Sequence, residues 1–281
     1  WIFDYPLSFG FDLYNTSRDR ERNVGYAYDE TRTGGDLRFG KELSEYLKAD
    51  LSWRLENIKI TDIAPEASNE IKKEEGENTI IGLNFGLTRD TRDNVFEPTT
   101  GRVSSGVLEL VGGPLGGDKD FAKFSTSFSN YFPVTKKTVL EAKIRAGLAT
   151  EYGDSDYIPI YERFFAGGAY TIRGYNERKV GPIDSSSNDP LGGEALLVGN
   201  LEYVFPLLEF IKGAAFFDTG NVWSKVGDFG SEGYKSGMGL GLRIKTPIGP
   251  LKLDYGFPLN KEPGETEKQG KFYFSISHGF F

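Results

Sequence analysis

The sequence Leu140-Glu141-Ala142-Lys143-Ile144-Arg145-Ala146-Gly147-Leu148 alternates apolar residues with charged or small ones without a break. Successive side chains of a β-strand point to opposite faces of a sheet, so this stretch presents one apolar face and one polar face. The same period of two recurs in 7–14, 47–56 and 81–88, whereas helical periodicity is hard to find. The pattern predicts an all-β chain.

The length of these segments distinguishes a membrane barrel from a soluble β-sandwich. A strand that crosses a membrane needs about 9–11 residues when tilted, with apolar side chains toward lipid and polar ones toward the lumen. A soluble β-sandwich has shorter strands and packs two inner faces together. The alternation therefore predicts a transmembrane antiparallel β-barrel of about twelve strands. We expect them at 7–16, 32–43, 46–60, 78–91, 101–113, 121–134, 138–153, 195–207, 211–223, 235–249, 250–260 and 271–281.

The connections alternate between long and short. Long polar loops are expected at 17–31, 61–77, 154–194, 224–234 and 261–270. Bacterial outer-membrane barrels have long extracellular loops and short periplasmic turns. With a periplasmic C-terminus, every long loop of this chain lies outside the cell. We therefore expect residues 1–281 to form one membrane domain in a bacterial outer membrane.

The composition agrees with such a barrel. The 281 residues carry a net charge of -8, no cysteine, 36 glycines and 14% aromatic residues. The absence of cysteine excludes disulfide scaffolds and thiolate metal sites, and the acidic balance argues against a nucleic-acid partner. The mean hydropathy of -0.40 is then the average of a lipid face and a wet face. Glycine and aromatic residues are typical of β-structure rather than of helices.

Motifs for chemistry are scarce. There is no glycine-rich loop ending in Lys-Ser/Thr, no histidine pair and no plausible Ser/His/Asp set, and the chain has one histidine. We expect no catalytic residues, no metal site and no cofactor. The chain is not expected to be an enzyme.

One segment of the longest loop stands out, Phe164-Phe165-Ala166-Gly167-Gly168-Ala169-Tyr170-Thr171-Ile172-Arg173-Gly174-Tyr175. Its aromatic residues are unusual for a loop wholly exposed to water, so it is expected to fold back into the lumen. Arg173 then needs carboxylate partners in a confined interior. The alternation of strands 195–207 and 211–223 points Glu202 and Asp218 inward.

These residues resemble the loop signature of the BamA/TamA superfamily of outer-membrane barrels. Further segments resemble that family in the same order along the chain, namely 90–101, 200–203, 216–223 and 239–251. The resemblance implies that the loop motif Ile172, Arg173, Gly174 and Tyr175 projects into the lumen. It also implies that Arg173 pairs with Asp218 and Glu202.

The resemblance implies lateral opening at a seam between the first and last strands. The C-terminal strand, with Phe272, Phe274, Ile276, Phe280 and Phe281, would form one side of that seam. Family barrels have sixteen strands preceded by periplasmic POTRA domains. Aligned from the C-terminus, the first four strands, every POTRA domain and a signal peptide are expected to be missing here. Either these residues are part of a longer barrel, or strand 7–16 closes against strand 271–281.

The function implied is that of an outer-membrane insertase that assembles other β-barrel proteins without enzymatic chemistry. Its partners would be outer-membrane lipids, unfolded outer-membrane proteins and accessory lipoproteins bound through periplasmic domains, with no nucleic acid. Two alternatives stay open: a two-partner-type protein secretion transporter and a passive porin-like channel.

Overall fold

The computed structural model describes residues 6–18, 27–231, 233–246, 250–260 and 269–276. They form a 12-stranded antiparallel sheet in which each strand pairs with its neighbours in sequence. The strands are β1 (Leu7–Arg18), β2 (Asp29–Ser44), β3 (Leu47–Thr61), β4 (Gly76–Asp90), β5 (Gly101–Val111), β6 (Phe121–Thr135), β7 (Thr138–Glu151), β8 (Ala195–Pro206), β9 (Ile211–Trp223), β10 (Lys235–Ile244), β11 (Leu251–Pro258) and β12 (Lys271–Ile276). Short helical turns are α1 (Asn69–Lys72), η2 (Gly113–Leu115), η3 (Ile160–Glu162) and η4 (Val226–Asp228).

The all-β prediction is confirmed, and most strands begin and end within three residues of their expected positions. Two strands are shorter than expected: β10 ends at Ile244 and β11 begins at Leu251. Pro247 and Pro250 lie between them, and proline cannot donate a hydrogen bond to a β-ladder. The predicted strand 271–281 is described only as far as Ile276.

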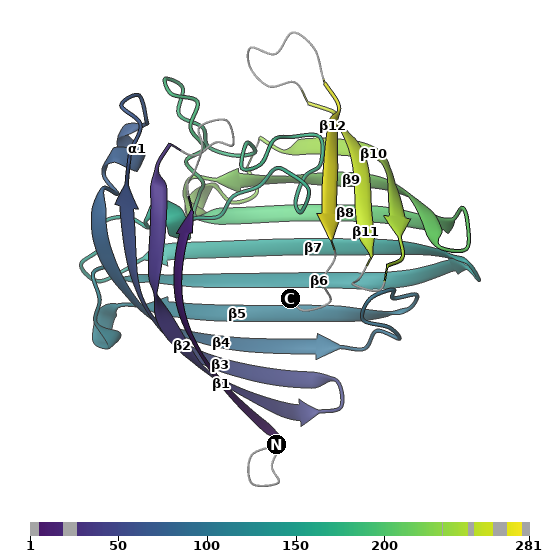
Figure 1. Ribbon diagram of the computed structural model, residues 1–281, viewed down its shortest axis with the longest axis horizontal. Coiled ribbons are helices and arrows are strands. Elements are labelled where there is room, and N and C mark those ends of the chain that lie inside the picture. Colours follow the sequence, from purple (N-terminus) through teal and green to yellow (C-terminus); the bar gives the residue numbers. More distant parts are fainter. Residues whose placement is uncertain (1–5, 19–26, 232, 247–249, 261–268, 277–281) are drawn as a thin grey trace.

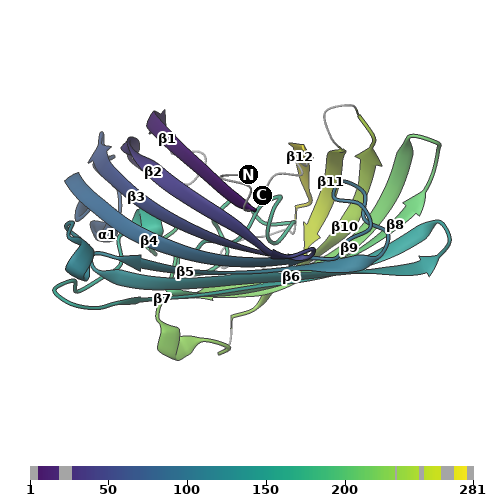
Figure 2. The same ribbon diagram turned by 90° about the horizontal axis from the view of Figure 1, so that it is seen from below.

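The sheet curves into an open trough rather than a closed cylinder (Figures 1 and 2). Within the described ranges, β1 pairs only with β2, and β12 pairs only with β11. Closure of strand 7–16 against strand 271–281, which the sequence left open, is therefore not observed. Both edges of the sheet carry backbone groups without a strand partner there.

The two faces of the sheet differ as the alternation predicts. Large apolar side chains such as Leu13, Leu240 and Phe272 are exposed on the outer, convex face. Charged side chains such as Glu56 and Asp218 are buried on the concave face. An apolar exterior around a polar interior is the arrangement of a membrane barrel. No helix in the described part of the chain is long and apolar enough to span a membrane.

The long loops gather at one end of the strands and the short turns at the other (Figure 1). One connection at the turn end, 91–100 between β4 and β5, is longer than the other turns there, as the expected strands 78–91 and 101–113 imply. The carboxylate of Asp93 orders it, accepting hydrogen bonds from the N–H of Thr99 (2.8 Å) and of Thr100 (3.1 Å).

A compact apolar core lies at the loop end. Ile58, Ile60 and Ile80 from the strands pack with Ile158 and Ile160 from the connection between β7 and β8. This connection, residues 152–194, is called the β7–β8 loop below. Its apolar contacts fix the loop against the end of the sheet.

Candidate functional site: the loop arginine and its carboxylates

The β7–β8 loop turns back onto the concave face of the sheet (Figure 2). Within the loop, backbone bridges join Phe164 to Gly193 and Ala166 to Val180. The four residues from Ile172 to Tyr175 are all buried. The four residues of the expected loop motif thus lie together inside the trough.

Arg173 is bound on three sides by carboxylates. Its Nε and Nη2 donate hydrogen bonds to Asp218 at 2.7 and 2.9 Å. Its Nη1 donates to Glu202 at 2.9 Å and to Asp254 at 3.1 Å. The guanidinium carbon also lies 3.5 Å from the ring centroid of Phe216. Planar guanidinium groups bind carboxylates through pairs of parallel hydrogen bonds, which is the geometry seen with Asp218.

A second arginine completes the cluster. Arg243 of β10 donates to both carboxylate oxygens of Glu202, at 2.9 and 2.7 Å, and to Asp254 at 2.6 Å. Two arginines therefore share three carboxylates in a buried network. Buried charges are tolerated only when each is paired and hydrogen-bonded, and here the pairing needs the loop to be seated.

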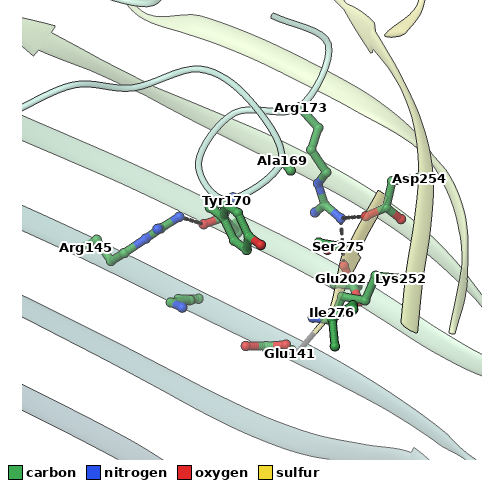
Figure 3. A pocket seen from close by; sticks show the side chains of 12 residues that line it. Glu141, Arg145, Ala169, Tyr170, Arg173, Glu202, Lys252, Asp254, Ser275 and Ile276 are labelled. Atoms are coloured by element: carbon green, nitrogen blue, oxygen red, sulfur yellow. Dashed lines mark hydrogen bonds and ion pairs between the residues drawn. The ribbon is translucent and has the colours of Figure 1, made fainter. Parts of the chain in front are cut away.

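Asn200 connects the cluster to the loop backbone. Its amide Nδ2 donates to the Thr171 carbonyl and to Asp218, both at 2.7 Å. Its Oδ1 accepts a hydrogen bond of 2.9 Å from Arg145 on β7. Beside the cluster is a hollow of about 500 Å³, lined by Lys143, Arg145 and Lys252 among others (Figure 3).

Glycines form the seat of the loop. A Cβ added at Gly237 of β10 would lie 1.9 Å from the carbonyl oxygen of Arg173, and one at Gly256 of β11 would lie 2.8 Å from the nitrogen of Gly174. Gly174 itself has a φ of +102°, which residues with a side chain rarely adopt. The loop can approach the strands this closely only because no side chain intervenes on either partner.

Two tyrosines fix the motif from the C-terminal side. The hydroxyl of Tyr175 donates to the carbonyl oxygen of Ser236 at 3.1 Å. The hydroxyl of Tyr273 on β12 accepts from the N–H of Gly174 at 2.9 Å and donates to the carbonyl oxygen of Tyr175 at 2.7 Å. The last described strand is therefore tied directly to the loop motif.

The residues expected at the seam divide into three groups. Phe272 and Phe274 are exposed on the outer face of β12. Ile276 does not share that exposure: it is half-buried and lines the hollow beside the cluster (Figure 3). It is the last described residue of the strand. Phe280 and Phe281 lie outside the described residues.

Sequence reasoning missed Asp254, Arg243, Tyr273 and the glycine seat. The signal for the first two was present, because the outward Tyr255 and Leu242 point their neighbours Asp254 and Arg243 inward. Whether these two residues lie close to Arg173 depends on the curvature of the sheet, and the alternation of residues does not predict that curvature. In the described ranges, no group of three histidine or acidic side chains is arranged to hold a metal ion.

Long strands with an apolar exterior, a charged interior and an inward-folded arginine loop define a transmembrane β-barrel protein of the bacterial outer-membrane type. The Omp85 superfamily domain matches residues 1–280, and the chain belongs to that superfamily. It is also similar to an outer membrane protein assembly factor BamA of Nitratidesulfovibrio vulgaris, with 34% identity over 99% of this chain and 35% of the relative. The chain thus spans about a third of that relative's length.

Solved structures share the fold. BamA from Haemophilus ducreyi, lacking POTRA domains 1–3, matches with a TM-score of 0.81 and 21% identity over 98% of this chain and 59% of its own. CdiB from Acinetobacter baumannii matches with a TM-score of 0.60 and 18% identity over 96% of this chain and 47% of its own. Proteins related to this chain are outer-membrane barrels, and the relative from Nitratidesulfovibrio vulgaris is named as an assembly factor.

Proposed function

We propose that this chain is the membrane domain of an outer-membrane insertase that assembles and inserts other β-barrel proteins. The observation that carries the proposal is the 34% identity, over 99% of the chain, to a protein named as an outer membrane protein assembly factor. The process makes and breaks no covalent bond. Residues 1–281 act as one domain, with unfolded outer-membrane proteins as substrates and outer-membrane lipids as surroundings.

The mechanism follows from the edges of the sheet. A strand with free N–H and C=O groups can pair with an incoming strand, a mode of recognition known as β-augmentation. The edge of β12 has no partner within the described residues, and Tyr273 links β12 to the loop motif. The motif Ile172–Tyr175, with Asp218 and Glu202, keeps the edge strand in place until a substrate strand pairs with it.

The orientation of the chain in the membrane is part of the same proposal. The described end of β12, at Ile276, pairs with Leu251 and so lies at the end of the sheet with the short turns. Short turns face the periplasm in barrels of this type, so we propose a periplasmic orientation for this end of β12. Accessory lipoproteins, which the resemblance implies, are expected to bind periplasmic domains rather than the strands.

The test is reconstitution of the protein that carries this chain into lipid vesicles. We expect an unfolded outer-membrane barrel substrate to insert into these vesicles faster than into empty ones. Equal rates would overturn the proposal. Delivery of an unfolded substrate into the vesicle interior would instead identify a secretion transporter, and a large steady conductance without insertion would identify a porin-like channel.

A further inference from the structure

The β7–β8 loop also reaches the opposite side of the trough from Arg173. The side chain of Glu162, at the end of η3, is buried among cations from three strands. The shortest distances from its carboxylate are 3.4 Å to Arg54 of β3, 3.6 Å to Arg32 of β2 and 3.9 Å to Lys123 of β6. An unpaired carboxylate at this depth would be costly, so these contacts hold it there.

The backbone at the end of η3 contributes to the same attachment. Lys123 Nζ donates to the carbonyl oxygen of Glu162 at 2.8 Å, and Arg32 Nη2 donates to that of Tyr161 at 3.4 Å. The last carbonyls of a helical turn lack partners within the turn and favour nearby cations. The carboxylate of Glu162 and the carbonyl groups at the end of η3 therefore contact the same cationic side chains.

We propose that Glu162 is a second ionic anchor of the β7–β8 loop, opposite in sign and in position to the Arg173 anchor. Arg173 carries a positive charge into the carboxylates of β8, β9 and β11, and Glu162 carries a negative charge into the cations of β2, β3 and β6. In Figure 2, β2 and β3 lie on one side of the trough and β8, β9 and β11 on the other, with β6 along the floor between them. The loop thus bridges the two sides of the trough and is held by ion pairs at Glu162 and at Arg173. The inference concerns the position of the loop and stands independently of the proposed insertase function.

The two anchors differ in strength. Without Arg173, Glu202 and Asp254 keep Arg243 as an ion-pair partner, and Asp218 keeps none in the described structure. Without the Glu162 carboxylate, Arg32 keeps ion pairs with Glu30 and Glu56, and Arg54 keeps ion pairs with Glu56 and Glu109. Lys123 loses its ion pair but keeps its hydrogen bond to the carbonyl oxygen of residue 162. Loss of Arg173 therefore leaves a buried carboxylate without an ion pair, whereas both arginines beside Glu162 keep carboxylate partners without it. We therefore expect the loop to detach from the sheet at Glu162 before it detaches at Arg173.

The test is limited trypsin digestion of the folded protein in detergent micelles, with cut sites identified by fragment mass. Glu162→Gln keeps the shape of the side chain and removes its charge, so a residue that only fills space would show no change. We expect cleavage after Arg163 to accelerate about tenfold, the change expected from losing roughly one charge-assisted hydrogen bond. Cleavage after Arg173 and Arg178 should stay slow, because the other anchor is intact.

Asp156→Asn is the matched control, since Asp156 is an exposed carboxylate of the same loop. It should be cut at the rate of the unaltered protein. Lys123→Met tests the anchor from the partner strand if Glu162→Gln does not fold, and a smaller acceleration after Arg163 is expected. Unchanged cleavage after Arg163 in both variants, or equal acceleration by Asp156→Asn, would overturn the proposal.

Discussion

Asp218 accepts hydrogen bonds from both the side chain and the backbone N–H of Arg173. One carboxylate oxygen accepts from the main-chain N–H at 3.0 Å and from Nε at 2.7 Å, and the other accepts from Nη2 at 2.9 Å. Asp218 is fully buried on β9. A single strand residue thereby fixes the backbone position of the loop as well as the direction of its arginine.

Replacing the loop arginine should displace the loop. Arg173→Ala leaves the buried Asp218 without an ion-pair partner in the described structure, and removing one member of a buried ion pair costs about 3–5 kcal/mol. Arg173→Lys keeps the charge but loses the paired hydrogen bonds, so an intermediate effect is expected. The measurement is complementation of a strain depleted of its own assembly factor, with Lys136→Ala in an exposed turn as the control. Full activity of Arg173→Ala would contradict the functional role given to the loop.

A methyl group in the glycine seat should have a similar effect without touching any charge. Gly237→Ala places a Cβ 1.9 Å from the Arg173 carbonyl oxygen, so the loop must move. Overpacking of this kind costs about 1–3 kcal/mol. Gly106→Ala on β5, where the nearest atom would be 3.8 Å away, is the control. Denaturant unfolding of both variants checks the difference, and equal stability would show that the loop is not closely seated.

The hydroxyl of Tyr273 should control the order of the last strand. Tyr273→Phe removes two hydrogen bonds to the loop and leaves the Gly174 N–H without its acceptor, for a loss of roughly 1–3 kcal/mol. We expect faster amide hydrogen exchange in β12 and an unchanged rate in β6. Tyr255→Phe, whose ring is on the outer face, is the matched control. Identical exchange of β12 in the two variants would rule out the coupling.

Adjacent residues on β6 should report the two faces of the sheet. Phe124 is exposed on the outer face, and Ser125 lies on the concave face. An arginine facing lipid costs about 2–4 kcal/mol near the bilayer centre, whereas one facing the lumen stays hydrated. Phe124→Arg should therefore lower the free energy of unfolding in lipid vesicles, and Ser125→Arg should leave it nearly unchanged. The reverse order would mean that the faces are wrongly assigned.

Acid should loosen the turn between β4 and β5. Hydrogen bonds from the Thr99 hydroxyl, and then from the Thr99 and Thr100 N–H groups, lower the pKa of Asp93 to about 2. Because the pKa is lower in the folded turn, its stabilisation is present above the ordinary carboxyl range and is lost as the pH falls through about 2. Amide exchange at Thr99 and Thr100 should accelerate there, and Thr99→Val should move that change to higher pH. Protection that is constant from roughly pH 5 to pH 1 would exclude this role of Asp93.

The sequence alone determined the strands and their faces. Alternation is a local property, since each residue points opposite to its neighbour whatever the rest of the chain does. This is why Leu140–Leu148 identified a membrane strand, and why Glu202 and Asp218 were expected to face Arg173. Pro247 and Pro250 lie between the end of β10 and the start of β11, although the predicted ranges included both prolines.

Only the tertiary structure decided which inward residues meet. Asp254 and Tyr273 reach the loop motif from strands about 80 and 100 residues away, because the sheet curves and the glycines of β10 and β11 admit the backbone. The same curvature brings Glu162 to Arg32 and Arg54 on the far side. It also leaves β1 and β12 apart within the described residues. Alternation assigns each residue to a face, but distances across that face depend on the whole sheet.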